Sequence, residues 1–349
     1  MKLRRTVVLA FACSVLVGIA GTARATTGTP INPGSRAPYT VAVIGDTPYV
    51  TDTDQTKANE LVQLISQINS DPKVDLVTHL GDIKSGSTKC SDAWNTQVLT
   101  WFETFSDPLV YTPGDNEWTD CHRANNDHYL PTERLEALRS VFFPNPGETL
   151  GGRPKRVLSD AEAGYVENVM WMESRTMFAT LNVPGSNNDT VPWSDAGVGW
   201  TGVSDPTLYP TQIEEHDART AADLDWIDET FATAQREGAA AVVLAFQADM
   251  WDSGATSDYQ AFVERIGTRA AAFARPVLLL EGDSHVFRVD HPFTPGDPLH
   301  SLFADTPDAP NVTRIVVEGS TNPTEYVRLT IDSEQPGVFS WARVPLAAA

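Results

Sequence analysis

Four apolar, strand-like runs of the chain each lead into the dipeptide Gly-Asp. The runs are residues 41–44, 76–80, 109–112 and 277–280, and the dipeptides end at Asp46, Asp82, Asp115 and Asp283. In open α/β sheets, ligands bind beyond the carboxyl ends of the strands, where glycine lets the backbone turn sharply. Four carboxylates at one edge repel one another unless they are protonated or neutralised, so the simplest partner is a bound cation. The pattern therefore predicts a metal site, with ordinary turns or helix caps as the alternative.

The first 25 residues have the pattern of a secretory signal peptide. Basic residues precede the apolar stretch 7–20, and Ala23-Arg24-Ala25 is a small-x-small cleavage site. A lipid-anchored start at Cys13 is the less favoured alternative. Residues 26–37 are a polar lead-in, and residues 38–349 are expected to form the folded domain. No later segment has the roughly 18 uninterrupted apolar residues of a membrane span. We therefore expect an exported protein, periplasmic or extracellular.

The chain is strongly acidic, with 46 Asp and Glu against 25 Lys and Arg and a formal net charge of −21. Removal of the leader would make this balance more negative, because four of the basic residues lie in it. Such a surface repels polyanions, which argues against nucleic acid or an anionic membrane as the main partner. The composition makes no prediction of an oligomeric state.

Cys90 and Cys121 are the two cysteines that would remain after cleavage. Each follows a Gly-Asp turn, so both are expected in loops over adjacent strand ends. Export to an oxidising compartment favours a disulfide between them, with two free thiols as the alternative.

Strand-like and helix-like periods alternate along the chain. Strands are expected at 39–44, 74–80 and 108–112, with helices after the first two and near 132–141, and this βαβαβ order predicts a parallel sheet. Later strands are expected at 168–173, 177–183, 240–246, 277–280, 312–317, 326–331 and 338–341, with helices near 224–231 and 258–273. Strands on both sides of the βα core predict two sheets packed face to face with helices outside. Residues 184–212 are expected to form a loop, either a lid over a substrate or plain surface decoration.

The motifs also occur in a specific order. Asp46 is followed by GDIKSG at 81–86, GDNE at 114–117, Gln247 at the end of a later strand, and GDSH at 282–285. This order resembles the calcineurin-like metallophosphoesterases, which carry Asp-x-His, Gly-Asp, Gly-Asn-His-Glu/Asp, a lone His and Gly-His-x-His. The resemblance spans most of the mature chain. It implies an α/β fold, the two-sheet αββα sandwich of that family, and hydrolysis of a phosphoester.

Several positions depart from the family pattern. Pro48, Gln247 and Asp283 stand where the family has metal-binding histidines, and Asp115 replaces the ligand asparagine. Asp46, the bridging aspartate Asp82 and His285 match. The resemblance thus implies that Asp82, Asp115, Gln247 and Asp283 hold a metal, with Asp46 and His285 beside Asp82. An oxygen-rich set favours Mn²⁺, Mg²⁺ or Ca²⁺ over Zn²⁺.

The resemblance also raises the question of which group protonates the leaving group. Asn116 stands where the family keeps the histidine that assists the leaving group, which makes it a candidate catalytic residue, but an amide cannot supply a proton near neutral pH. His122, in the same loop, is the predicted general acid, with a solvated loop histidine as the alternative.

Cationic and aromatic residues near these motifs have two interpretations each. Lys84 and Arg123 are predicted to bind the substrate anion, or else to pair with the excess carboxylates. His79 is expected to be a core histidine inside an apolar strand. Tyr49 is expected to lie at the rim of the site or to pack in a turn.

The sequence thus predicts an exported, metal-dependent hydrolase of a small phosphoester. One alternative is a catalytically silent metal- or anion-binding protein on the same fold, since several reactive histidines are missing. The other is an ester hydrolase with Ser284 as nucleophile, because Gly-Asp-Ser also marks a family of serine hydrolases.

Overall fold

In the computed structural model, strand β1 (Tyr39–Ile44) is buried on both of its faces. Val41 and Val43 point into one apolar cluster, whereas Ala42 and Ile44 point into another, as the two-residue period of a strand requires. A strand with two apolar faces must be covered on both sides. The rest of the fold supplies these two coverings.

The structure describes residues 35–50, 56–193, 210–252, 257–320 and 325–347. Contacts divide the chain into Met1–Ile31 and Asn32–Ala349, and every described residue lies in the second part. The expected signal peptide lies outside the described residues, and the expected boundaries after residues 25 and 37 stay predictions. Within the described ranges, the structure contains no helix that combines the length and the apolar character needed to cross a membrane.

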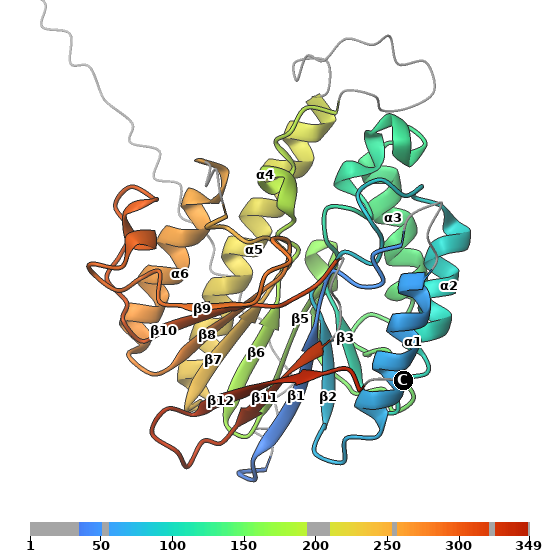
Figure 1. Cartoon of the computed structure of the whole chain (residues 1–349). Coiled ribbons are helices and arrows are strands. Elements are labelled where there is room, and N and C mark those ends of the chain that lie inside the picture. Colours follow the sequence, from blue (N-terminus) through green and yellow to red (C-terminus); the bar gives the residue numbers. More distant parts are fainter. Residues whose placement is uncertain (1–34, 51–55, 194–209, 253–256, 321–324, 348–349) are drawn as a thin grey trace, which may run out of the picture. The chain divides into compact units, whose positions relative to one another are not determined.

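The first sheet has five strands in the order β12-β11-β1-β2-β3. Strands β1, β2 (Leu76–His79) and β3 (Leu109–Tyr111) run parallel to one another. Strand β11 (Glu325–Ile331) is antiparallel to β1, and β12 (Phe339–Pro345) is antiparallel to β11. Helices α1 (Thr56–Asn69), α2 (Asp92–Phe102) and α3 (Pro131–Phe142) cover its outer face (Figure 1). The buried residues of α1 form one apolar face at helical spacing: Ala58, Leu61, Leu64, Ile65 and Ile68.

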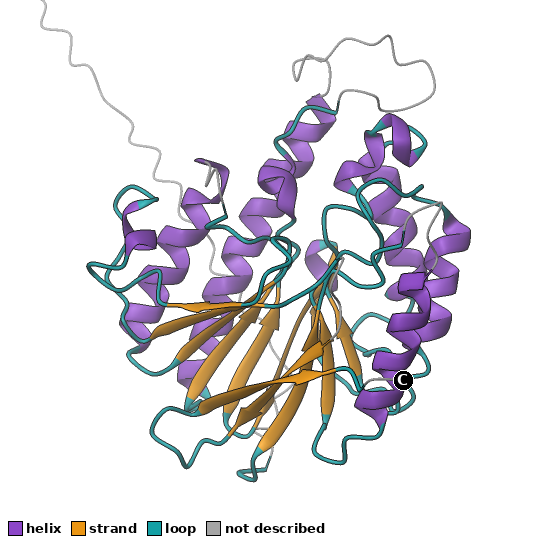
Figure 2. Ribbon diagram, in the orientation of Figure 1, coloured by secondary structure: helices purple, strands orange, loops and turns teal. Residues whose placement is uncertain are grey.

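The second sheet has seven strands in the order β4-β5-β6-β7-β8-β10-β9. Strands β6 (Thr176–Thr180), β7 (Ala241–Ala245), β8 (Val277–Glu281) and β10 (Val312–Val316) run parallel. Strands β4 (Leu158–Asp160), β5 (Tyr165–Glu173) and β9 (Arg288–Asp290) are antiparallel to their neighbours. Helices α5 (Pro210–Arg236) and α6 (Gln260–Phe273) lie on its outer face (Figure 2).

The two sheets pack face to face over a shared apolar core. Val41 and Val43 of β1 belong to the same cluster as Val243 of β7 and Leu278 of β8. A second cluster lies between the first sheet and helices α1–α3. The expected fold class, an α/β two-sheet αββα sandwich, is confirmed.

Some local expectations differ from the structure. The short strands β4 and β9 were not predicted, because three residues show no clear period. Val338 was expected to begin the last strand, but its φ of +58° places it in the preceding turn. The expected loop 184–212 contains a left-handed turn, α4 (Gly185–Asp189), and the start of α5. Residues 194–209 of that loop lie outside the described residues.

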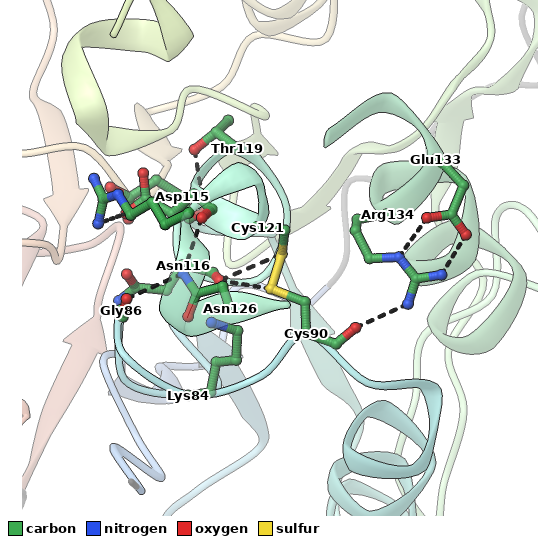
Figure 3. The surroundings of a disulfide bond; sticks show 12 residues. Lys84, Gly86, Cys90, Asp115, Asn116, Thr119, Cys121, Asn126, Glu133 and Arg134 are labelled. Atoms are coloured by element: carbon green, nitrogen blue, oxygen red, sulfur yellow. Dashed lines mark hydrogen bonds and ion pairs between the residues drawn. A yellow bond between two sulfur atoms is a disulfide. The ribbon is translucent and has the colours of Figure 1, made fainter. Parts of the chain in front are cut away.

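The predicted disulfide between Cys90 and Cys121 is present, with the two Cα atoms 5.8 Å apart. It joins the loop after β2 to the loop after β3, and both cysteines are buried. The two sulfur atoms lie 3.6 and 3.8 Å from the carbonyl oxygen of Asn116 (Figure 3). Because it closes a loop of about 30 residues, it stabilises the fold by roughly 3–4 kcal/mol in the chain-entropy model.

Candidate metal centre

The predicted ligands come together where parallel strands of both sheets end. Asp46 follows β1, Asp82 follows β2 and Asp115 lies beyond β3, whereas Gln247 follows β7 and Asp283 follows β8. The first four are buried. The two sheets therefore contribute side chains to one site, as expected for the carboxyl ends of strands in an α/β fold.

Two overlapping groups of side chains are placed to hold a metal ion. One consists of Asp46, Asp82 and His285, and the other of Asp82, Asp115 and Asp283. Within each group, one ligand atom from every residue lies within 4.8 Å of the others. Asp82 belongs to both groups, so its carboxylate lies between two potential cation positions.

The electrostatics of these carboxylates fit a cation. Burial, together with the charges of Asp115 and Glu117, raises the pKa of Asp82 well above its ordinary value. Burial and the charges of Asp115 and Asp46 do the same for the pKa of Asp283. Burial also raises the pKa of Asp46, although its hydrogen bond with His285 opposes the change. A divalent cation would relieve the repulsion that disfavours the charged forms.

Backbone conformation aims these side chains. Asp46, Asp82, Asp283 and His285 have left-handed φ values of 50°, 59°, 69° and 62°. Such values are uncommon outside glycine and cost of order 1–3 kcal/mol each, and they cluster at functional sites. The adjoining glycines allow close approach: a Cβ on Gly114 would collide with Asp82 Oδ1, and one on Gly282 would lie 2.7 Å from Asp46 Oδ2.

Glu117 belongs to the site, although no role was predicted for it from the sequence. Its Oε1 accepts hydrogen bonds from the backbone N–H of Asp82 at 3.0 Å and of Gly114 at 2.7 Å, and from the Tyr111 hydroxyl at 2.8 Å. Burial raises the pKa of Glu117 to about 7. Glu117 thus ties the turn after β2 to the turn after β3. The position of Glu117 at the end of the GDNE motif was the sequence signal from which its place in the site could have been predicted.

Asn116 holds the shared carboxylate. Its Nδ2 donates to Asp82 Oδ2 at 2.6 Å, and its backbone N–H donates to Asp82 Oδ1 at 3.3 Å. Both oxygens of Asp82 are therefore oriented by one residue of the neighbouring loop. This observed contact is one of orientation, and the predicted catalytic role of Asn116 stays a prediction.

Gln247 bridges the two sheets at the site. Its Nε2 donates to Asp115 Oδ1 at 3.1 Å, and its Oε1 accepts from the backbone N–H of Gly185. In this orientation its oxygen faces Gly185 and its amide nitrogen faces the carboxylates. Its role as a metal ligand stays a prediction.

His285 and Tyr49 form one side of the site. His285 Nε2 lies 3.2 Å from Asp46 Oδ1. Burial lowers the pKa of His285, but the hydrogen bond and charge of Asp46 outweigh it and raise the pKa. The Tyr49 ring packs edge-on against the His285 ring with centroids 4.9 Å apart, and its hydroxyl lies 3.4 Å from Asn116 Nδ2. Tyr49 therefore contacts both His285 and Asn116, as expected for a residue at the rim of the site.

The three other predicted functional residues differ in depth. Lys84 is 1% exposed, its Nζ donates to Ser85 O at 3.2 Å, and burial lowers its pKa to about 8. The side chain of Arg123 is 38% exposed and lies 2.5 Å from Asp120. His122 ends the 3-10 turn Thr119–His122 and is 3% exposed, so the solvated-loop interpretation of this histidine is wrong.

His79 supports the two turns that carry Asp46 and Asp82. It is fully buried, and its Nε2 donates to Thr47 O at 2.6 Å while its Nδ1 accepts from Gly81 N at 3.2 Å. These two contacts require the neutral imidazole with the proton on Nε2. The expectation of a core histidine is confirmed.

Comparison with known protein families confirms the resemblance. The sequence model of the calcineurin-like phosphoesterase family matches residues 39–244. No curated protein matches the chain. A solved dimetal phosphatase from Danio rerio is 12% identical with a TM-score of 0.45, over 88% of this chain and 99% of its own. A purple acid phosphatase, PPD1, from yellow lupin (Lupinus luteus) seeds is 12% identical with a TM-score of 0.47, over 90% of this chain and 55% of its own.

The buried His79 predicts a loss of stability in mild acid. Burial lowers its pKa to about 4, from about 6.5 in an unfolded chain. The native state therefore binds fewer protons than the unfolded chain between these values. His79 therefore contributes about 3 kcal/mol to the free energy of unfolding. This contribution is fully present above about pH 6.5 and is lost as the pH falls toward 4.

Denaturant unfolding of metal-free protein from pH 4 to 7 measures this effect. The free energy of unfolding of the wild type, minus that of His79→Gln, should increase with pH, because the amide does not titrate. The exposed His128, changed to Gln, is the control and should follow the wild type. Parallel curves for wild type and His79→Gln would contradict the assignment.

Proposed function

The chain belongs to the calcineurin-like phosphoesterase family, and from this premise we propose that it hydrolyses a small phosphoester with divalent cations at two positions that share Asp82. The observation that carries the proposal is the pair of overlapping ligand groups at the strand ends. Four carboxylates gathered in or near the protein interior are a costly arrangement without a cation, and the pKa is raised at Asp46, Asp82 and Asp283. The same arrangement supplies the oxygen ligands that hard cations prefer.

The proposed cation positions differ in their ligands. Asp46, Asp82 and His285 form the first, and Asp82, Asp115 and Asp283 form the second, with Gln247 beside it. Mn²⁺, Mg²⁺ or Ca²⁺ is the proposed metal, because only one of the five residues in the two groups is a histidine. When bound, such a cation lowers the pKa of a coordinated water and polarises a phosphoryl oxygen.

The protein's own residues supply orientation and protons. Asn116 orients Asp82 through two hydrogen bonds and has no proton to give near neutral pH. His122, buried in the same loop, is the proposed donor to the leaving group. Arg123 is the proposed contact for the substrate anion, because its side chain is partly exposed. The burial of Lys84 favours a role in balancing the charge of the carboxylates.

The alternative of a serine hydrolase loses support in the structure. Ser284 Oγ accepts a hydrogen bond from Arg288 at 3.1 Å. A guanidinium stays protonated and cannot act as a general base. A nucleophilic serine needs a base in hydrogen-bond contact, and within the described ranges of the chain no such base contacts Ser284 Oγ.

Export is part of the proposal. It rests on the leader-like pattern of residues 1–25 and is supported by the buried disulfide between Cys90 and Cys121, a bond typical of oxidising compartments.

Removal of Asp82 should abolish cation binding. The wild type should be stabilised by Mn²⁺, Mg²⁺ or Ca²⁺ more than by Zn²⁺, by about 2.7 kcal/mol at a hundredfold excess over the dissociation constant. Asp82→Ala should lose both this shift and hydrolysis of an aryl phosphate. Its metal-free melting temperature should change little, because the substitution relieves repulsion while it removes contacts.

Thermal melts with each metal provide the measurement. Asp107→Ala removes another buried aspartate, at the opposite end of β3, and should keep the metal-induced shift. If no divalent cation shifts the wild-type midpoint, or if Zn²⁺ alone does, the hard-cation site is wrong.

The proton donor has its own test. His122→Ala should lower turnover by roughly 10²–10⁴ for phosphoesters with poor leaving groups, and far less for activated esters that need no proton. Steady-state rates with both kinds of ester give the comparison, and the exposed His128→Ala is the control. A small effect of equal size on both esters would remove His122 from the reaction.

A further inference from the structure

The left-handed turn α4 lies against the carboxylates of the second cation position. A Cβ built on Gly185 would lie 2.9 Å from Asp115 Oδ2 and 2.9 Å from both carboxylate oxygens of Asp283. The next residue, Ser186, places its hydroxyl 2.8 Å from Asp115 Oδ2 and 2.8 Å from Asp120 Oδ1. Asp115 and Asp283 belong to the group with Asp82 and not to the group with His285. The turn therefore approaches one of the two cation positions.

The conformation of this turn is imposed by its surroundings. Ser186, Asn187, Asn188 and Asp189 all have positive φ, between 49° and 66°. Four consecutive left-handed residues without glycine are unfavourable on their own, so neighbouring elements must hold them.

Two buried side chains hold the turn. Arg219 of α5 is fully buried and donates to Asn188 Oδ1 at 2.6 Å and to Asn188 O at 3.1 Å. The Tyr259 hydroxyl accepts from Asn188 N at 3.0 Å and donates to Pro184 O at 2.9 Å. The turn is thus fixed from α5 and from the segment before α6, independently of Asp115.

We propose that Gly185 and Ser186 are built parts of the Asp82–Asp115–Asp283 cation position. Ser186 is a positioning residue: its hydroxyl fixes Asp115, and such contacts behind a ligand orient it toward the metal. Gly185 keeps open the space between Asp115 and Asp283, which a methyl group would fill. The inference rests on the proposed function and makes the two cation positions unequal, because the turn controls only one of them.

Two substitutions separate the hydroxyl from the open space. Ser186→Gly removes the hydroxyl while it keeps the left-handed backbone at no steric cost. Gly185→Ala adds the methyl group at a residue whose φ is not left-handed, so its effect is one of space. Both variants keep all the proposed metal ligands.

Two control positions lie in turns at the opposite end of the strands, away from the site. Ser174 is a buried serine that shares the left-handed φ of Ser186, at 44°, in the turn between β5 and β6, so Ser174→Gly repeats the first substitution away from the site. Gly337 has open space around a built Cβ, so Gly337→Ala repeats the second.

Isothermal titration calorimetry of the full-length protein with Mn²⁺, in the absence of substrate, measures the number of bound ions and their affinities. We expect two ions in the wild type and in both controls. Gly185→Ala should bind one ion with unchanged affinity and lose the other. Ser186→Gly should bind one ion as before and the other roughly 10–100-fold more weakly.

Two ions with unchanged affinities in both variants would overturn this inference and leave the proposed function standing. Equal weakening of both positions would also overturn it. A wild type that takes up no Mn²⁺, Mg²⁺ or Ca²⁺ would overturn the proposed function and the inference together. If Gly185→Ala does not fold, the Ser186→Gly titration decides alone.

Discussion

The repulsion among buried carboxylates around Asp82 is the constraint on which the site depends. Asp82 is almost fully buried, and the charges of Asp115, Glu117, Asp46 and Asp283 all act to raise its pKa. Buried like charges are costly, and a fold keeps them only when surrounding contacts fix them and a counter-charge offsets them. Two of these contacts are hydrogen bonds: Asn116 Nδ2 donates to Asp82 Oδ2, and the backbone N–H of Asp82 donates to Glu117 Oε1. A cation in each of the two ligand groups is the counter-charge that we propose for this arrangement.

The fold brings these charges together only when both sheets are in place. Asp46, Asp82 and Asp115 lie at strand ends of the first sheet, whereas Asp283 and His285 follow β8 of the second. The apolar cluster between the sheets thereby fixes the distance between the two halves of the site. Gln247 and the disulfide between the loops after β2 and β3 add polar and covalent ties at the same edge.

Strand positions and strand-end carboxylates were predictable from the sequence because both follow from short-range patterns. Apolar runs that end in Gly-Asp predict that Asp46, Asp82, Asp115 and Asp283 meet at one edge, since parallel strands align their carboxyl ends. The role of Glu117 was not predictable in this way, because its partners are backbone N–H groups of two different turns. Ser186 lies in a Gly- and Asn-rich run that reads as a loop, and its conformation depends on Arg219, which lies 33 positions further along the chain. The burial of Lys84 and His122 depends in the same way on long-range packing.

The central claim is that one carboxylate, Asp82, serves two cation positions formed by different strands. Anomalous X-ray scattering from a crystal of the protein grown with Mn²⁺ tests this claim most directly. The account predicts two peaks about 3.5–4 Å apart, the spacing of two-metal hydrolytic sites, with Asp82 in contact with both. One peak would lie beside Asp46 and His285 and the other beside Asp115 and Asp283. A single peak, or two peaks that Asp82 does not join, would contradict the account.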